Sequence, residues 1–293
     1  MKLQMSRRQE LSELAETVVG LHSPQPGAVN LDSILRENGI RLHPNRFPED
    51  FDAIIVPTGN TFHIHLNIRK VDGNPDSRRA RFSIAHELGH YFIDEHRTRL
   101  LTEPPQPSLC GLFDGNECKE EDEADHFAAN LIMPPSHFKS AAHGQGSPLE
   151  TILKLSRKFD ASLTATAIQF TNHVSDRSMV IRWTPEGTLA WALPGRGYRT
   201  DGYRTVIFKT PEKLPKDSAT ANVIAGKHDH DKGVLTMASI FQNVALAGER
   251  NTLVTEEAIA LGDYGVLTII SDHGHAPTTL SPRTQRRQSR KFN

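Results

Sequence analysis

The chain has 293 residues, 24% of them charged, and a formal net charge of −1 at pH 7. This length allows two domains, and the even charge balance does not single out nucleic acid or an anionic membrane surface as a partner. No apolar run approaches the roughly 20 residues that cross a bilayer, and no apolar stretch follows the first charged residues, so we expect a cytoplasmic protein without a membrane partner.

The N-terminal quarter of the chain has the pattern of a small mixed fold. Helices are expected at Arg8–Leu21 and Leu31–Asn38, and strands at residues 39–42, 53–56 and 61–67. The last strand alternates apolar and polar residues, which predicts one buried and one exposed face. Its histidines, His63 and His65, fall on the polar face, so we expect them to face solvent or substrate rather than a metal.

A His-Glu-x-x-His motif follows, formed by His86, Glu87 and His90. Histidines four residues apart on a helix share a face and can bind one metal, while the intervening glutamate can take a proton from water. We expect the helix to begin with Asn74 as N-cap and Pro75 as its first residue. The alternative is a core helix whose histidines are satisfied by hydrogen bonds. The motif indicates a zinc hydrolase.

A catalytic zinc needs a third protein ligand, and the acidic segment 119–134 supplies candidates. Its apolar residues form one helical face, which Pro134 terminates. At 100° per residue, Glu121 lies about 50° from the centre of that face and Glu123 about 110° from it, so Glu121 is the better inward-pointing ligand. Glu120 lies about as near the face on the other side, so this geometry does not separate it from Glu121.

The rest of the acidic run has two interpretations. Asp125 comes four residues after Glu121 and could accept the remaining ring N–H of a metal-ligating histidine, which would fix the tautomer of that ring. Alternatively, the run is a solvated helix start. That alternative accounts well for Glu120, Asp122 and Glu123, and less well for Glu121 and Asp125.

The segment between the two metal-site helices holds both cysteines of the chain, Cys110 and Cys118, and the proline-rich residues 104–107. We expect an irregular loop that could cover the cleft. In a reducing compartment the two cysteines are expected to be free thiols rather than a disulfide. A Cys118 thiolate that competes for the metal is the less favoured alternative.

The two motif segments together resemble the ImmA/IrrE family of zinc metallopeptidases. The first segment runs from Arg81 to Tyr91 with the sequence RFSIAHELGHY. The second, from Glu121 to Pro134, reads EDEADHFAANLIMP and is similar to the family signature E-x-E-A-N-x-F-A-x-x-L-L-M-P. The resemblance covers about half of the chain, to roughly residue 145, and implies a zincin-like peptidase fold.

The resemblance also implies a cofactor, a set of roles and a substrate. Zn²⁺ would be held by His86, His90 and Glu121, with Glu87 as the catalytic base. The chain departs from the family at Asp125, where asparagine is usual, and this makes the surroundings of the ligands more anionic. The strand before the zinc helix would border the cleft and could pair with an extended peptide. The implied substrate is a helix-turn-helix transcriptional repressor, cut to derepress stress, phage or mobile-element genes.

Residues 149–159 and 163–170 predict two short helices whose spacing resembles a helix-turn-helix. A helix that reads DNA bases should offer Arg, Lys, Asn or Gln near its start, and the second helix offers little beyond Gln169. We therefore favour a packing role over DNA binding.

From Ser178 onward the pattern is rich in β-strands and indicates a second α+β domain, whose ligand no motif identifies. Strands are expected at residues 179–183, 188–193, 205–209, 234–241 and 266–271, with a helix near Glu256–Leu261. The histidines within residues 228–231 and 272–275 are expected to lie in surface loops rather than to form a second metal site.

The sequence thus predicts an α+β protein of four parts. Residues 1–145 are expected to form a mostly helical zincin-like peptidase domain with a small sheet, and residues 146–177 a helical segment that resembles a helix-turn-helix. Residues 178–276 are expected to form a β-rich α+β domain, for which a sensor role is one option, and residues 277–293 a disordered basic tail. We expect a zinc endopeptidase that cleaves a protein substrate. The alternative is a non-catalytic regulator that binds a repressor, a toxin or DNA.

Overall fold

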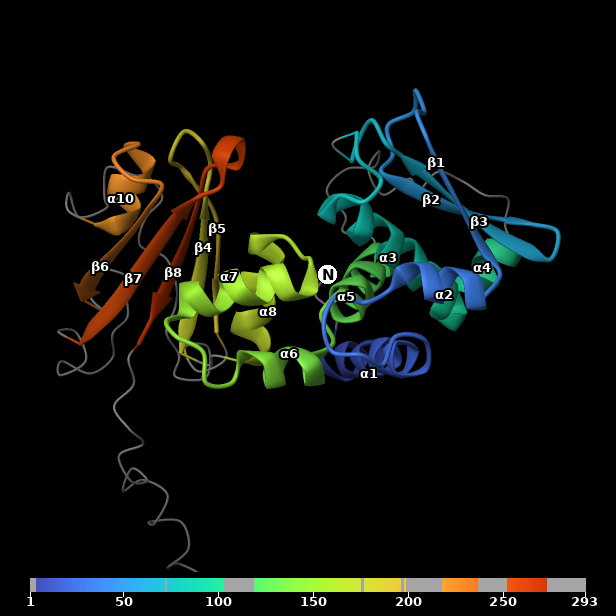
Figure 1. Cartoon of the computed structure of the whole chain (residues 1–293), viewed down its shortest axis with the longest axis horizontal. Coiled ribbons are helices and arrows are strands. Elements are labelled where there is room, and N and C mark those ends of the chain that lie inside the picture. Colours follow the sequence, from blue (N-terminus) through green and yellow to red (C-terminus); the bar gives the residue numbers. More distant parts are fainter. Residues whose placement is uncertain are drawn as a thin grey trace, which may run out of the picture. The chain divides into compact units, whose positions relative to one another are not determined.

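The computed structural model of the chain describes residues 4–71, 73–102, 119–174, 177–195, 198, 218–236 and 252–272. These residues form a mixed α+β structure with two small sheets (Figure 1). The chain divides into two compact units, residues 1–174 and 175–293. The finer division into four parts stays a prediction. No helix in the described part of the chain is long and apolar enough to cross a membrane.

The first unit combines a helical body with a three-stranded sheet. Its elements are α1 (Met5–His22), α2 (Leu31–Glu37), β1 (Ile40–Asn45), β2 (Ala53–Thr58), β3 (Thr61–Asn67), α3 (Arg78–Phe92), α4 (Asp94–Thr102), α5 (Lys119–Ile132), α6 (Pro135–Ala142), α7 (Pro148–Phe159) and α8 (Leu163–His173). The helices and strands expected before residue 70 are confirmed, with small differences at their ends. The central strand β3 pairs parallel with β1 and antiparallel with β2.

The core of the first unit lies between the sheet and the helices. Phe62, Ile64 and Leu66 of β3 are buried, as their alternation predicts. The sheet packs through β2 and β3 on α3, α3 packs on α5, and α5 packs on α1 (Figure 1). At the crossing of α3 and α5, a Cβ on Gly89 would lie 3.1 Å from the Cα of Ala124, so glycine permits this close approach. The packing of α3 on α5 positions the site.

The predicted start of the motif helix is wrong by one turn. The N-cap of α3 is Ser77, whose Oγ accepts a hydrogen bond from the N–H of Ala80 at 3.1 Å. Asn74 instead closes a local turn, in which its Oδ1 accepts a hydrogen bond from the N–H of Asp76 at 2.9 Å. Both asparagine and serine are good N-caps, and asparagine also favours turns. Asn74 therefore forms the turn, and Ser77, three residues later, caps the helix.

The second unit is an antiparallel sheet with a short helix on one face. Its elements are β4 (Ser178–Trp183), β5 (Leu189–Pro194), α10 (Ala219–Ile224), β6 (His230–Thr236), β7 (Leu253–Ala260), η4 (Gly262–Tyr264) and β8 (Val266–Ser271). The strands lie in the order β5-β4-β8-β7-β6, and α10 packs mainly on β7 and β6 (Figure 1). The core includes Trp183, Val254 and Ile270.

The helix predicted near Glu256–Leu261 is wrong, because these residues belong largely to strand β7. Glu256 is buried, and its carboxylate accepts hydrogen bonds from the N–H groups of Ala219 and Thr220 and from the Thr220 hydroxyl. These tertiary contacts outweigh the weak helix preference of the two adjacent glutamates.

Several sequence expectations lie outside the described residues. They are the strand at 205–209, the end of the strand at 234–241, the cysteines Cys110 and Cys118, and the tail at 277–293.

Candidate metal centre

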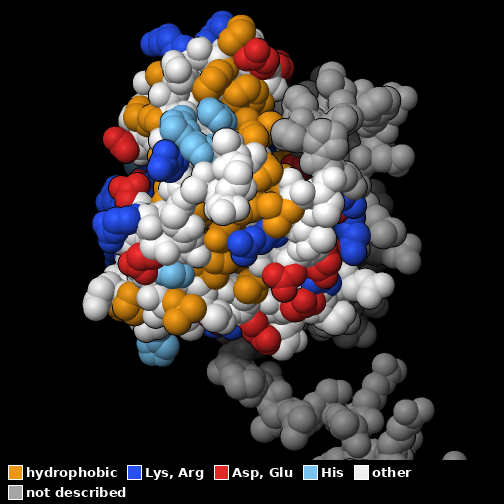
Figure 2. All heavy atoms as spheres, turned by 90° about the vertical axis from the view of Figure 1, so that its right-hand side faces the viewer, with side chains coloured by type: hydrophobic (Ala, Val, Ile, Leu, Met, Phe, Trp, Pro, Cys, Tyr) orange, Lys and Arg blue, Asp and Glu red, His pale blue; other side chains and the backbone are white. Residues whose placement is uncertain are grey.

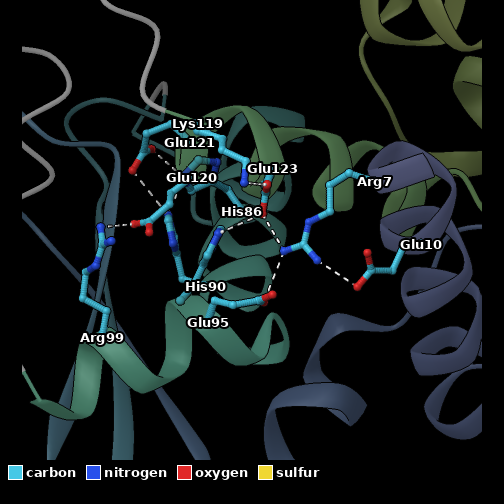
Figure 3. Close-up of polar contacts among 11 residues, drawn as sticks. Arg7, Glu10, His86, His90, Glu95, Arg99, Lys119, Glu120, Glu121 and Glu123 are labelled. Carbon is cyan, nitrogen blue, oxygen red and sulfur yellow. Dashed lines mark hydrogen bonds and ion pairs between the residues drawn. The ribbon is translucent and has the colours of Figure 1, made fainter. Parts of the chain in front are cut away.

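His86, His90 and Glu121 converge on one point between α3 and α5 (Figure 3). Nε2 of His86 lies 3.0 Å from Oε2 of Glu121 and 3.2 Å from Nε2 of His90. Nε2 of His90 lies 3.6 Å from Oε1 of Glu121. One ligand atom from each residue lies within 4.8 Å of the other two, so this group could hold a metal ion.

The donor set suits zinc. Two imidazole nitrogens and one carboxylate oxygen are a common ligand set of catalytic zinc sites, which leave a fourth position for water or substrate. Ligand atoms at about 2.1 Å from a tetrahedral ion are about 3.4 Å apart. The separations of 3.0, 3.2 and 3.6 Å among these three side chains bracket that value. The residues therefore fit the cofactor that the sequence predicts.

Glu87 lies beside this group, on the same helix, and it is buried. Its Oε2 accepts a hydrogen bond from the N–H of Ile55 on β2 at 2.9 Å. Burial raises the pKa of Glu87 to about 7, with a further contribution from the charge of Glu121 and an opposing one from His86. A carboxylate with this pKa can accept a proton and return it near neutral pH.

Asp125 contacts the outer edge of His86. Its Oδ1 lies 2.8 Å from Nδ1 of that ring, so the carboxylate can hold a proton on Nδ1 and leave Nε2 for the metal. Burial lowers the pKa of His86, but the hydrogen bonds with Asp125 and Glu121 outweigh burial and raise it to about 10. The sequence predicted that Asp125 could accept a ring N–H of one of the two histidines, and the structure places it against His86. The role of Asp125 toward the ligand stays a prediction.

The structure separates the two glutamates that helical spacing left equivalent. Glu121 belongs to the convergent group, whereas Oε2 of Glu120 lies 2.6 Å from Nη1 of Arg99 on α4 (Figure 3). Glu121 is therefore the third side chain that the fold brings to the two histidines. Its role as a ligand stays a prediction.

The expectation that Glu123 is solvated is wrong. Its side chain is only 3% exposed, and Oε2 lies 2.7 Å from Nη2 of Arg7 on α1 and 3.3 Å from Nε2 of His96 on α4. Burial raises the pKa of Glu123, but the hydrogen bonds and charges of Arg7 and Lys119 together outweigh burial, and the net shift of the pKa is downward. A helical-face argument misses this burial because Arg7 of α1 and His96 of α4 reach Glu123 from other helices, outside the apolar face of α5.

Residues 70–171 match the family model described as Peptidase_M78, IrrE N-terminal-like domain. The chain carries an ImmA/IrrE-family domain. The matched segment contains α3 and α5, and therefore the whole convergent group. The resemblance based on the two motif segments is confirmed, and peptidases of this family are metal-dependent.

The comparison with solved structures found a Mycobacterium tuberculosis transcriptional regulator with a TM-score of 0.56 and 13% sequence identity. The match covers 90% of this chain and 76% of that chain. At this identity the likeness concerns the fold alone. No curated protein gave a significant match.

The first unit also presents a patch of histidines on its surface, before the segment that matches the family model (Figure 2). On the sheet face opposite α3, Nε2 of His43 lies 2.8 Å from Nδ1 of His63, and the ring of His65 stacks on that of His43. Within the described part of the chain, only His86, His90 and Glu121 bring three ligand atoms this close together. His63 and His65 thus lie apart from the metal group, as the alternation of β3 suggests.

Proposed function

We propose that this chain is a zinc-dependent endopeptidase. One observation carries the proposal. His86, His90 and Glu121 converge with a donor set that suits zinc, and beside them lies Glu87, whose carboxyl group has a pKa of about 7. A site that only bound a structural zinc would use four protein ligands and would not need a glutamate between its histidines. The match to a metal-dependent peptidase family supports the same conclusion.

Each side chain has a definite task in this reaction. When bound, the zinc would polarise the scissile carbonyl and lower the pKa of the attacking water. Glu87 takes a proton from that water and delivers it to the leaving amine. The N–H of Ile55 holds one oxygen of Glu87 in place, and Asp125 orients the ring of His86.

The expectation that the strand directly before the zinc helix pairs with a peptide is wrong, because β3 is the central strand and both of its edges are already paired. The edge strand nearest Glu87 is β2. In the described structure β2 pairs with β3 on one side, and the N–H of Ile55 points to Glu87 on the other side. In an antiparallel pair a residue directs its N–H and its C=O to the same side, so the Ile55 carbonyl also faces α3. The N–H of Ile55 is already donated to Glu87, and Pro57, which has the same orientation, has no N–H. We propose that an extended substrate would contact this edge through the Ile55 carbonyl rather than through a full ladder of hydrogen bonds.

We further propose that the substrate is a helix-turn-helix transcriptional repressor. The proposal is supported by the resemblance of the two motif segments to the ImmA/IrrE family, whose domain model matches residues 70–171. It is tested by incubating the zinc-loaded chain with repressors encoded beside its gene and looking for a discrete fragment.

Glu87→Gln tests the mechanism. We expect this variant to bind zinc and substrate but to lose at least about a thousandfold in cleavage rate, since a carboxamide cannot take the proton. Glu49→Gln, which changes an exposed glutamate outside the site, is the control and should cleave like the wild type. Cleavage by Glu87→Gln at the wild-type rate would show that Glu87 is not the base.

The second candidate is a regulator that binds a repressor, a toxin or DNA without cutting it. The description of the structural neighbour as a transcriptional regulator favours it. This candidate predicts that Glu87→Gln keeps the full regulatory effect on a reporter gene. Loss of that effect in a variant that still binds its partner would exclude it.

A further inference from the structure

The first turn of α5 carries Glu121 between two glutamates that are held from different sides (Figure 3). Oε2 of Glu120 lies 2.6 Å from Nη1 of Arg99 on α4. Oε2 of Glu123 lies 2.7 Å from Nη2 of Arg7 on α1. Glu121 itself points into the metal group. Its direction therefore depends on how the two neighbouring glutamates are anchored.

Arg7 is the anchor with the most contacts. Its guanidinium contacts Oε1 of Glu10 at 2.8 Å, Oε2 of Glu95 at 3.2 Å and Oε2 of Glu123 at 2.7 Å. These carboxylates come from α1, α4 and α5, and the Arg7 side chain is mostly buried. Hydrogen bonds between charged groups are the strong ones, and the flat guanidinium fixes their directions. Arg7 thus ties three helices together beside the metal group.

Glu123 connects this anchor to the histidines. It lies two residues after Glu121, and its carboxylate also lies 3.3 Å from Nε2 of His96. His96 is buried, and its ring centroid lies 5.1 Å from that of His90. A continuous series of contacts therefore runs from Arg7 through Glu123 and His96 to His90.

We propose that Arg7 is a positioning residue of the metal centre. By holding Glu123 it fixes the first turn of α5, which aims Glu121, and it keeps His96 against the ring of His90. Without Arg7, the cation left beside the buried carboxylate of Glu123 would be the exposed Lys119, whose Nζ lies 3.3 Å from Oε1 of Glu123, and the carboxylate would move toward that cation or toward water. Either movement rotates the turn that carries Glu121. The inference rests on the proposed zinc centre and assigns part of its geometry to Arg7, which lies 116 positions before Glu123 in the sequence.

Arg7→Gln tests this role, with Arg8→Gln as the matched control. Arg8 is the next residue of the same helix, and its guanidinium forms no ion pair within the part of the chain that the structure describes. Zn²⁺ affinity is measured by competition with a chromophoric chelator, and site geometry by the absorption spectrum of the Co²⁺-substituted protein. We expect Arg7→Gln to weaken Zn²⁺ binding about 10- to 100-fold and to change the Co²⁺ bands, and Arg8→Gln to match the wild type.

Urea unfolding of the metal-free proteins separates positioning from a general effect on stability. If Arg7→Gln unfolds more easily but keeps the wild-type Zn²⁺ affinity and Co²⁺ spectrum, Arg7 is only structural and the proposal is wrong. A wild-type chain that takes up neither Zn²⁺ nor Co²⁺ would contradict the proposed function, and this inference with it.

The route through Glu123 has its own test. In a Glu123→Gln background, removing Arg7 should change Zn²⁺ affinity by less than about threefold, because the partner that transmits the effect is already altered. An equal loss in both backgrounds would contradict that route. If Arg7→Gln does not fold, Arg7→Lys replaces it, since lysine keeps the positive charge but lacks the planar guanidinium that contacts several carboxylates at once. We expect about tenfold weaker Zn²⁺ binding in Arg7→Lys, and wild-type behaviour would overturn the proposal.

Discussion

Asp125 and His86 are joined by a contact of 2.8 Å between Oδ1 and Nδ1, at the ring nitrogen that does not face Glu121. The imidazole of His86 therefore lies between two carboxylates. Burial works against protonation of this ring, but the two hydrogen bonds outweigh it, and the pKa of His86 rises to about 10. The other histidine of the group behaves in the opposite way, because burial and then the charge of His86 lower the pKa of His90 to about 4.

Zinc binding should accordingly compete with one proton. At neutral pH the metal-free group holds a proton on His86 but none on His90, so each zinc should displace about one proton. The apparent Zn²⁺ affinity should rise about tenfold per pH unit between about pH 7 and pH 9. Calorimetry in buffers of different ionisation enthalpy counts the protons released. A Zn²⁺ affinity that is flat over this range would contradict the prediction.

The same proton stabilises the metal-free fold. The pKa of His86 is raised above its usual value of 6.5, so this contribution is fully present below about pH 6.5 and is lost as the pH rises through about 10. This contribution of the proton to stability disappears when a metal binds, because the metal replaces the proton on His86.

Asp125→Asn should change this pH dependence without removing the ligand. The amide oxygen can still accept the Nδ1 proton, but the negative charge is gone, so the pKa of His86 should fall below its wild-type value. The Zn²⁺ affinity should then become less steep with pH near neutrality. Histidine NMR titration of the metal-free protein measures the pKa directly. Asp32→Asn on α2 is the control, and an unchanged His86 titration in Asp125→Asn would contradict the assigned contact.

Gly89→Ala should loosen the site through the helix crossing. The added Cβ would lie 3.1 Å from the Cα and 3.3 Å from the Cβ of Ala124, so α3 and α5 must separate slightly. We expect the free energy of unfolding to fall by about 1–3 kcal/mol and Zn²⁺ binding to weaken. Circular dichroism in urea measures the change in stability.

Gly20→Ala is the matched control for that change. Gly20 is also helical, lies in α1, and a Cβ there meets nothing within 4 Å. It should stabilise the protein by up to about 1 kcal/mol, because alanine favours helix. Similar effects of the two substitutions would mean that the crossing does not require glycine.

Glu256→Ala should destabilise the second unit. The substitution leaves the buried N–H groups of Ala219 and Thr220 without their acceptor, which should cost about 3 kcal/mol. The Thr220 hydroxyl keeps its contact of 2.7 Å with the Thr268 hydroxyl. Both tryptophans of the chain, Trp183 and Trp191, lie in this unit, so fluorescence in urea reports its unfolding selectively. Asp263→Asn, at an exposed position of η4, should leave the transition unchanged. A wild-type transition for Glu256→Ala would contradict the importance of this buried acceptor.

Local sequence patterns predicted much of the site because its residues obey helical and strand periodicity. His86 and His90 share a face by their spacing, and Glu121 lies near the apolar stripe of α5, so both helices present these side chains to each other. The buried side of β3 likewise followed from alternation along one strand.

The errors concern residues whose environment is made by distant parts of the chain. Glu123 can be buried because the guanidinium of Arg7 pairs with its carboxylate, and Arg7 lies 116 residues away in sequence. Glu256 is a strand residue because the start of α10, 36 or 37 residues earlier, supplies its hydrogen-bond donors. Each is a polar side chain whose partner no local pattern predicts. Helical-face geometry also could not choose between Glu120 and Glu121, a choice that depends on Arg99 holding one of them.

The three converging side chains come from two helices, so the metal group exists only while α3 and α5 stay packed. A bound ion would oppose the separation of the two helices. It would add about 1.4 kcal/mol to the free energy of unfolding for each tenfold excess of free metal over the dissociation constant. Cellular proteases cut chains that open in this way. The supply of metal in the cell would then set how long each molecule survives, as well as whether it is active.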